Sequence, residues 1–145
     1  MIWKYLGGSM FEISSVLGKL ISQAKNNCVE TDAIKQEIDH LITINCGKFE
    51  HYVKLNKQKF QLVKQILSIQ EKKQCFLQRD LYKLVSEQLY SDDDLSGKLN
   101  NLVRMNILAF NPTTSAYALQ GNALYYGLRQ YIQRVTNSES IEVFN

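Results

Sequence analysis

The most constraining feature of this sequence is a run of short, differently patterned units between residues 79 and 119. Two helical patterns come first, outlined by Leu81, Leu84, Val85 and Leu89 and then by Leu95, Leu99, Leu102 and Val103. Ser91 and the three aspartates after it form an N-terminal signal for the second helix, which closes near Asn106. Two short helices joined by a tight polar turn are typical of a helix-turn-helix.

Two short apolar or aromatic runs follow directly, at residues 107–110 and 116–119. They flank the connector 111–115, which is rich in turn-forming residues. This pattern predicts a β-hairpin. Because the hairpin comes directly after a helix-turn-helix, the sequence predicts a winged helix-turn-helix with a small β-hairpin wing.

The residues before this unit indicate helices. Ser9 and Glu12 form a capping box, so we expect a helix from there to about Lys25, with apolar residues at three- and four-residue steps. Thr31 or Asp32 is expected to cap a second helix. Its apolar positions are Ile34, Ile38, Leu41 and Ile42, and we expect Cys46 and Gly47 to end or bend it.

A third helix is strongly amphipathic and is predicted to span residues 56–71. Asn122 is expected to cap a final helix, and the residues after it have the composition of a loosely held tail. The predicted fold class is therefore mostly α, with a helical subdomain over residues 1–72, a winged helix over 73–136 and a flexible tail over 137–145.

Charge is distributed unevenly along the chain. Residues 46–79 carry a net charge of +6, whereas the segments before and after them carry −1 and −2. This basic segment could face an acidic partner, or it could only keep a helix soluble. Its basic residues are Lys48, Lys54, Lys57, Lys59, Lys64, Lys72, Lys73 and Arg79.

The sequence offers no pattern for a metal site or a disulfide framework. The three cysteines, Cys28, Cys46 and Cys75, are widely spaced and include no CxxC pair, which favours reduced thiols in a cytoplasm. His40 and His51 lie eleven residues apart without a suitably spaced third ligand, so both are expected on helix surfaces. No apolar run approaches the roughly 18 residues that span a bilayer. We expect a cytoplasmic protein that makes no membrane contact.

Catalytic motifs are also missing from the sequence. A phosphate-binding P-loop needs Gly-Lys followed by Ser or Thr, and the three Gly-Lys pairs, at positions 18, 47 and 97, are each followed by an apolar residue. No nucleophile is placed beside a base by any recognisable motif. The chain is therefore expected not to be an enzyme.

DNA binding by the second helix of the helix-turn-helix is the sharpest alternative. Its outward residues are expected to be drawn from Lys98, Asn100, Asn101 and Arg104, types that bond to base edges or phosphates, and Lys98, Asn101 and Arg104 are the predicted contacts. Against this alternative, the N-terminal end of the helix bears three carboxylates that phosphates would repel, and the wing tip has no Lys or Arg. We therefore expect protein contact, and keep a winged-helix DNA-binding regulator as the alternative.

Two stretches of the chain resemble the C-terminal part of archaeal-type AAA+ P-loop ATPases, which are related to the signal-transducing STAND NTPases. Residues 3–13, with sequence WKYLGGSMFEI, resemble the entry of that family's lid helix. Residues 102–114, with sequence LVRMNILAFNPTT, are similar to its passage from the second helix into the wing. Together they bracket residues 1 to about 132. Met10 stands where the family usually has proline, and the Walker motifs that the family carries upstream are absent here.

The resemblance implies a lid-like subdomain followed by a winged helix. It implies a regulatory module that docks on an ATPase core, its own or a partner's, or on another protein. It also implies nucleotide contact at Gly7, Gly8 and Ser9, so ATP would be bound only when the chain is joined to a missing ATPase core. From the charge pattern, Lys57, Lys59 and Lys64 are added to the predicted partner contacts. The sequence does not indicate the oligomeric state.

Overall fold

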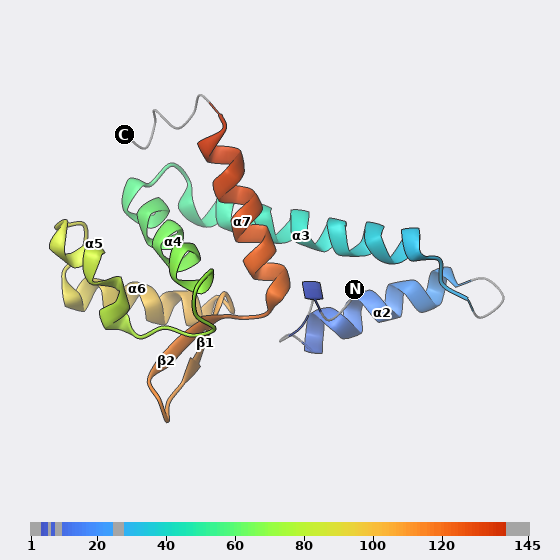
Figure 1. The fold of residues 1–145 in the computed structure, drawn as a ribbon, viewed down its shortest axis with the longest axis horizontal. Coiled ribbons are helices and arrows are strands. Elements are labelled where there is room, and N and C mark those ends of the chain that lie inside the picture. Colours follow the sequence, from blue (N-terminus) through green and yellow to red (C-terminus); the bar gives the residue numbers. More distant parts are fainter. Residues whose placement is uncertain (1–3, 6, 8–9, 25–27, 139–145) are drawn as a thin grey trace.

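The architecture comes from a computed structural model that describes residues 4–5, 7, 10–24 and 28–138. Within these residues the fold is mostly helical, with α-helices α2 to α7, a short 3-10 helix η1 and one antiparallel hairpin of strands β1 and β2. The winged-helix-like part gathers at one end, and a pair of helices projects from it (Figure 1). The predicted fold class, mostly α with a small β-hairpin in a winged-helix-like arrangement, is confirmed.

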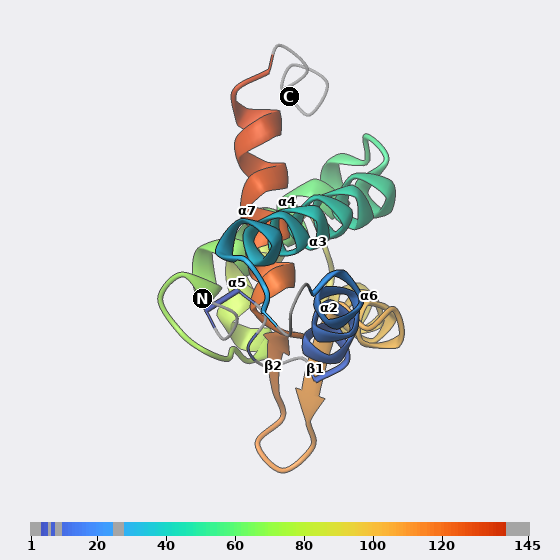
Figure 2. The same cartoon turned by 90° about the vertical axis from the view of Figure 1, so that its right-hand side faces the viewer.

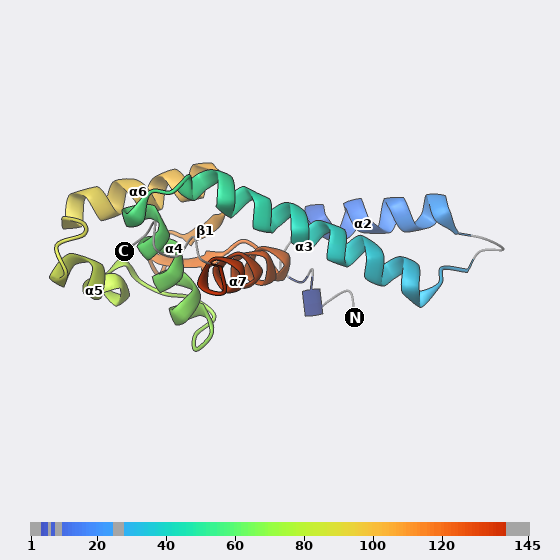
Figure 3. The same cartoon turned by 90° about the horizontal axis from the view of Figure 1, so that it is seen from above.

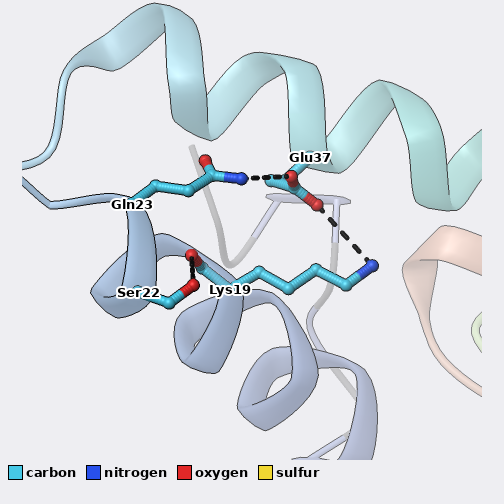
Figure 4. Close-up of polar contacts among 4 residues, drawn as sticks. All are labelled: Lys19, Ser22, Gln23 and Glu37. Atoms are coloured by element: carbon cyan, nitrogen blue, oxygen red, sulfur yellow. Dashed lines mark hydrogen bonds and ion pairs between the residues drawn. The ribbon is translucent and has the colours of Figure 1, made fainter.

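The projecting pair consists of α2 (Met10–Gln23) and α3 (Thr31–Val53), which lie side by side in two perpendicular views (Figures 1 and 3). Their small core contains Val16, Leu20 and Ile38, closed by Ala123 of a later helix. Toward the tip of the pair, Lys19 Nζ lies 3.8 Å from Glu37 Oε2, and Gln23 Nε2 donates to Glu37 Oε1 (Figure 4). Polar contacts thus continue the packing of the pair beyond its apolar core.

Helix α3 corrects two expectations. It runs unbroken through Cys46 and Gly47, because Cys46 and Phe49 are buried while Gly47 lies on the exposed side, where it costs only about 1 kcal/mol relative to alanine. Its N-cap position is occupied by Glu30, whose side chain makes no capping bond. Thr31 and Asp32, each expected as the cap, are instead the first two helical residues.

Helix α4 (Lys57–Gln70) begins where the sequence predicts. Asn56 is its N-cap, and the Asn56 side chain accepts a hydrogen bond from the backbone N–H of Lys59 at 3.0 Å. Past its C-terminal end, Phe76 exchanges two backbone hydrogen bonds with Tyr117, of 2.8 and 2.7 Å. This isolated β-bridge pairs Phe76 with the outer edge of β2, and the sequence did not predict it.

The helix-turn-helix contains η1 (Gln78–Leu81), α5 (Tyr82–Ser86) and α6 (Asp92–Arg104). The first of the two predicted helices is therefore shorter than expected, since it starts as a 3-10 turn and ends before Leu89, with Gln88 in a left-handed conformation (φ 59°). In the hairpin, β1 (Leu108–Asn111) pairs with β2 (Ala116–Leu119), and Leu108 stands opposite Leu119. The hairpin projects away from the helices (Figure 2).

The last helix, α7 (Asn122–Thr136), crosses α3 and packs on it (Figures 1 and 3). Its N-cap is Gly121 (φ 99°), so Asn122, expected as the cap, is the first helical residue. The main hydrophobic core unites residues from both sides of position 72: Phe49 of α3, Leu62 of α4, Leu81, Leu99 of α6 and Leu128 of α7 are among its most buried members. No helix in the described ranges is long and apolar enough to cross a membrane.

Candidate functional site

The surface of α6 is where the sequence places contact with DNA or protein. Ser91 caps this helix, its Oγ accepting from the backbone N–H of Asp94 at 3.2 Å. Asp92, Asp93 and Asp94 all lie in the first turn and are exposed. Negative charge there is stabilised by the helix dipole, so these carboxylates have a structural role and at the same time face solvent.

The residues predicted to contact a partner follow along the same helix. Asn101 and Arg104 are exposed, three residues apart, whereas Lys98 is half-buried. Asp94 lies seven residues before Asn101, which places both side chains on one face of the helix. The face that would present Asn101 and Arg104 to DNA therefore presents a carboxylate as well.

The wing carries no charge. None of the residues from Leu108 to Leu119 is ionisable as an acid or base at neutral pH, and the exposed side chains of its first strand are Ala109, Phe110 and Asn111. At the tip, Asn111 Oδ1 accepts from the backbone N–H of Thr113 at 2.9 Å. A wing of this kind has no cation for a backbone phosphate.

The three lysines predicted on α4 do not share one surface. Lys57 and Lys64 are exposed and seven residues apart, so they lie on the same side of the helix. Lys59 is half-buried, and its Nζ lies 5.0 Å from the centre of the Tyr52 ring in α3. Two of the three lysines are therefore free to meet a partner, and the third packs within the fold.

Of the predicted nucleotide contacts, only Gly7 lies within the described residues; Gly8 and Ser9 lie outside them. The carbonyl oxygen of Gly7 accepts from the backbone N–H of Asn122 at 2.8 Å, and Asn122 Nδ2 donates to the carbonyl of Lys4 at 3.0 Å. The N-terminal turn is thus attached to the start of α7. Beside it lies a cavity of about 660 Å³, lined among others by Lys4, Gly7, Lys72, Lys73, Asn122 and Tyr126.

Arg79 is exposed and lies at a surface site that the sequence did not predict. It lies in η1 and lines three hollows, which extend toward α5, toward the wing and along the Phe76 bridge. Tyr82 and Phe110 stand on either side, 70% and 43% exposed. In the sequence, the only indication of this site was that Arg79 is the last residue of the basic segment. The aromatic residues Tyr82 and Phe110 belong to other elements, α5 and β1.

Metal-ligating side chains and thiols are the remaining candidates for chemistry. No cluster of three or more His, Cys, Asp or Glu side chains there could hold a metal ion. Of the three free cysteines, Cys28 and Cys75 are exposed and Cys46 is buried, and burial raises the pKa of the Cys46 thiol. A raised pKa lowers the thiolate fraction, so Cys46 is a poor nucleophile.

Compared with known protein families, curated proteins and solved structures, the chain has no match. The likeness of residues 3–13 and 102–114 to AAA+ ATPases is therefore a sequence-based expectation. The function of the chain is therefore inferred from its own sequence and structure and not from a related protein.

Proposed function

We propose that this chain is a non-catalytic regulatory module whose winged helix docks on another protein, and that its partner is the core of an AAA+ type ATPase. One observation carries the first part of the proposal: α6 begins with three exposed carboxylates, and the wing that follows this helix carries no charge. DNA carries one negative charge per about 1.7 Å of its axis and repels such a surface. A protein partner is not uniformly negative, so it can contact this acidic surface.

The composition of the neighbouring surface supports the same proposal. Tyr82, Met105 and Phe110 are exposed on the winged helix, and Arg79 lies between two of them. Aromatic residues, methionine and arginine are enriched at protein interfaces relative to the rest of a protein surface. The ATPase core as partner rests on the sequence resemblance alone.

Photo-crosslinking in cells tests the proposal. We would replace Phe110 with p-benzoylphenylalanine and, as a matched control, His40, which is exposed on α3. The expected result is a protein adduct that contains Walker motifs and forms at position 110 but not at position 40. An adduct with a protein that lacks these motifs would remove the ATPase from the proposal, and an adduct with nucleic acid alone would contradict protein docking.

DNA binding is the second candidate function, and the exposure of Asn101 and Arg104 on α6 is the observation in its favour. Fluorescence anisotropy with a generic duplex, at low and at physiological salt, distinguishes it. Phosphate contacts make the affinity fall steeply with salt, and each one that is lost reduces the salt slope by about one. We expect no binding at low salt. Tight, salt-sensitive binding that Arg104→Glu abolishes would make this helix a DNA reader.

A further inference from the structure

Arg79 lies where three surface hollows meet, and we name this region the Arg79 face: Gln78, Arg79, Tyr82, Phe110 and Thr114. The hollow toward α5 has a volume of about 510 Å³, the hollow toward the wing about 470 Å³ and the hollow along the Phe76 bridge about 370 Å³. Arg79 lines all three, and Gln78 lines the first two. The three hollows therefore adjoin one another at Arg79.

Phe110 and Gln78, on two sides of the Arg79 face, are each held by contacts within the fold. The Phe110 ring lies 4.9 Å from the ring of Tyr117, which is buried and stacks at 5.8 Å on Phe76. On the other side, Gln78 Nε2 donates to the backbone carbonyl of Asp92 at 3.0 Å, which joins η1 to the start of α6. A preformed surface loses little conformational entropy on binding, and Tyr and Arg are the residue types that most often dominate binding energy.

The positive charge of Arg79 is available to a partner. Asp80, the neighbour of Arg79, is already engaged: it accepts from the backbone N–H of Leu77 at 2.8 Å and pairs with Lys73 at 3.8 Å. Among the described residues Arg79 has no ion pair. Asp92 lines the hollow toward α5 together with Arg79 and Tyr82, but makes no ion pair with Arg79. A guanidinium presents a planar fork of donors that fits a carboxylate with two parallel hydrogen bonds.

We propose that the Arg79 face binds a segment of a partner protein in which a carboxylate is flanked by an apolar side chain. The carboxylate pairs with Arg79, and the apolar side chain packs against Tyr82 or Phe110 in an adjoining hollow. This inference rests on the proposed protein-docking function and names the chemistry of the partner.

Peptide selection tests the Arg79 face without a known partner. A random-peptide phage library is selected on the purified full chain, and the enriched peptides are synthesised, labelled and measured by fluorescence anisotropy. We expect sequences with Asp or Glu next to an aromatic or aliphatic residue. Their affinity should fall by about tenfold or more in Arg79→Glu and in at least one of Tyr82→Ala and Phe110→Ala, because hot-spot residues carry most of the binding energy. Arg79→Lys should recover part of the affinity, since lysine keeps the charge but loses the fork.

Matched controls separate this result from unfolding and from general charge effects. Arg129→Glu makes the same charge change at an exposed position of α7, and it should leave the affinity unchanged. Circular dichroism and urea unfolding verify that each variant is folded. Enriched peptides that bind Arg79→Glu as well as the parent chain would overturn the inference while leaving protein docking intact. Binding of an oligonucleotide that is lost in Arg79→Glu would instead assign the Arg79 face to phosphate and contradict both proposals.

Discussion

Gly127 of α7 lies against Asn45 of α3 so closely that a Cβ atom at position 127 would be 2.6 Å from the Cβ of Asn45. The same atom would lie 3.0 Å from the backbone of Asn45 and of Cys46. Asn45 is fully buried, and its Nδ2 donates to Glu12 Oε2 of α2 at 3.5 Å. Three helices therefore meet at this point, and the absence of a side chain at Gly127 allows α7 to cross α3.

Gly127→Ala is expected to destabilise the fold by about 1–3 kcal/mol, the usual cost of overpacking a core, because the clash involves backbone that cannot move aside. Urea unfolding followed by circular dichroism measures the change. Gly47→Ala is the matched control in α3. It meets no atom within 4 Å and should stabilise the fold by about 0.5–1 kcal/mol through its higher helix propensity. Equal effects of the two substitutions would contradict this account of the crossing.

Glu12 should make the stability depend on pH. Burial raises the pKa of the Glu12 carboxyl above its ordinary value of 4.5, while the hydrogen bond from Asn45 and the charge of Lys48 oppose that shift. Between 4.5 and the raised pKa the folded state binds more protons than the unfolded state, so the free energy of unfolding falls as pH rises through this window. Glu12→Gln should remove that fall.

Unfolding free energies measured from below pH 4.5 up to neutral pH check this expectation. Glu87→Gln, which changes an exposed carboxylate outside the α2–α3 pair, is the control and should follow the parent protein. A Glu12→Gln variant with the pH dependence of the parent would show that the half-buried Glu12 carboxyl does not contribute.

Two buried phenols provide a test of hydrogen bonding. The hydroxyls of Tyr52 and Tyr90 are buried and have no hydrogen-bond partner among the described residues. An unsatisfied buried polar group costs about 1–3 kcal/mol, so Tyr90→Phe is expected to stabilise the fold by about 1 kcal/mol. Tyr82→Phe, which removes an exposed hydroxyl, should have no effect. Loss of stability in Tyr90→Phe would indicate that the hydroxyl is bonded, for example through a buried water molecule.

The same phenols should limit stability in alkali. Burial raises the pKa of Tyr52 to about 12 from an ordinary value of 10, and it also raises the pKa of Tyr90, with the nearby Tyr52 adding to the shift. The unfolded state loses these protons first, so the free energy of unfolding declines as pH rises from 10 toward 12. Unfolding curves across this range should decline less steeply for Tyr52→Phe than for the parent chain.

The lysines of α4 should separate into two classes. Lys59→Gln is expected to lower stability by about 0.5–1 kcal/mol, because it removes the ammonium group above the Tyr52 ring. Lys57→Gln, at an exposed position of the same helix, should leave stability unchanged. Thermal or urea unfolding measures both. A larger loss of stability in Lys57→Gln than in Lys59→Gln would contradict the conclusion that Lys59 packs within the fold and Lys57 does not.

Local patterns were enough to predict most elements of the fold. The apolar spacing of α2, α4, α6 and α7 identified these helices, Ser91 identified the start of α6, and the turn-rich residues 111–115 identified the hairpin. These signals act over a few residues, through capping bonds and burial of one face. The sequence alone therefore determined the element order and the winged-helix-like arrangement.

The predictions that were wrong, and the features that the sequence did not predict, depend on contacts between distant segments. Gly47 does not interrupt α3, because packing of the neighbouring buried residues outweighs its low helix propensity. The Phe76–Tyr117 bridge, the crossing of Gly127 over Asn45 and the grouping of Arg79 with Phe110 join residues between 31 and 82 positions apart. Periodicity reports which side of an element is buried but not which element covers it, and only the tertiary structure decided that.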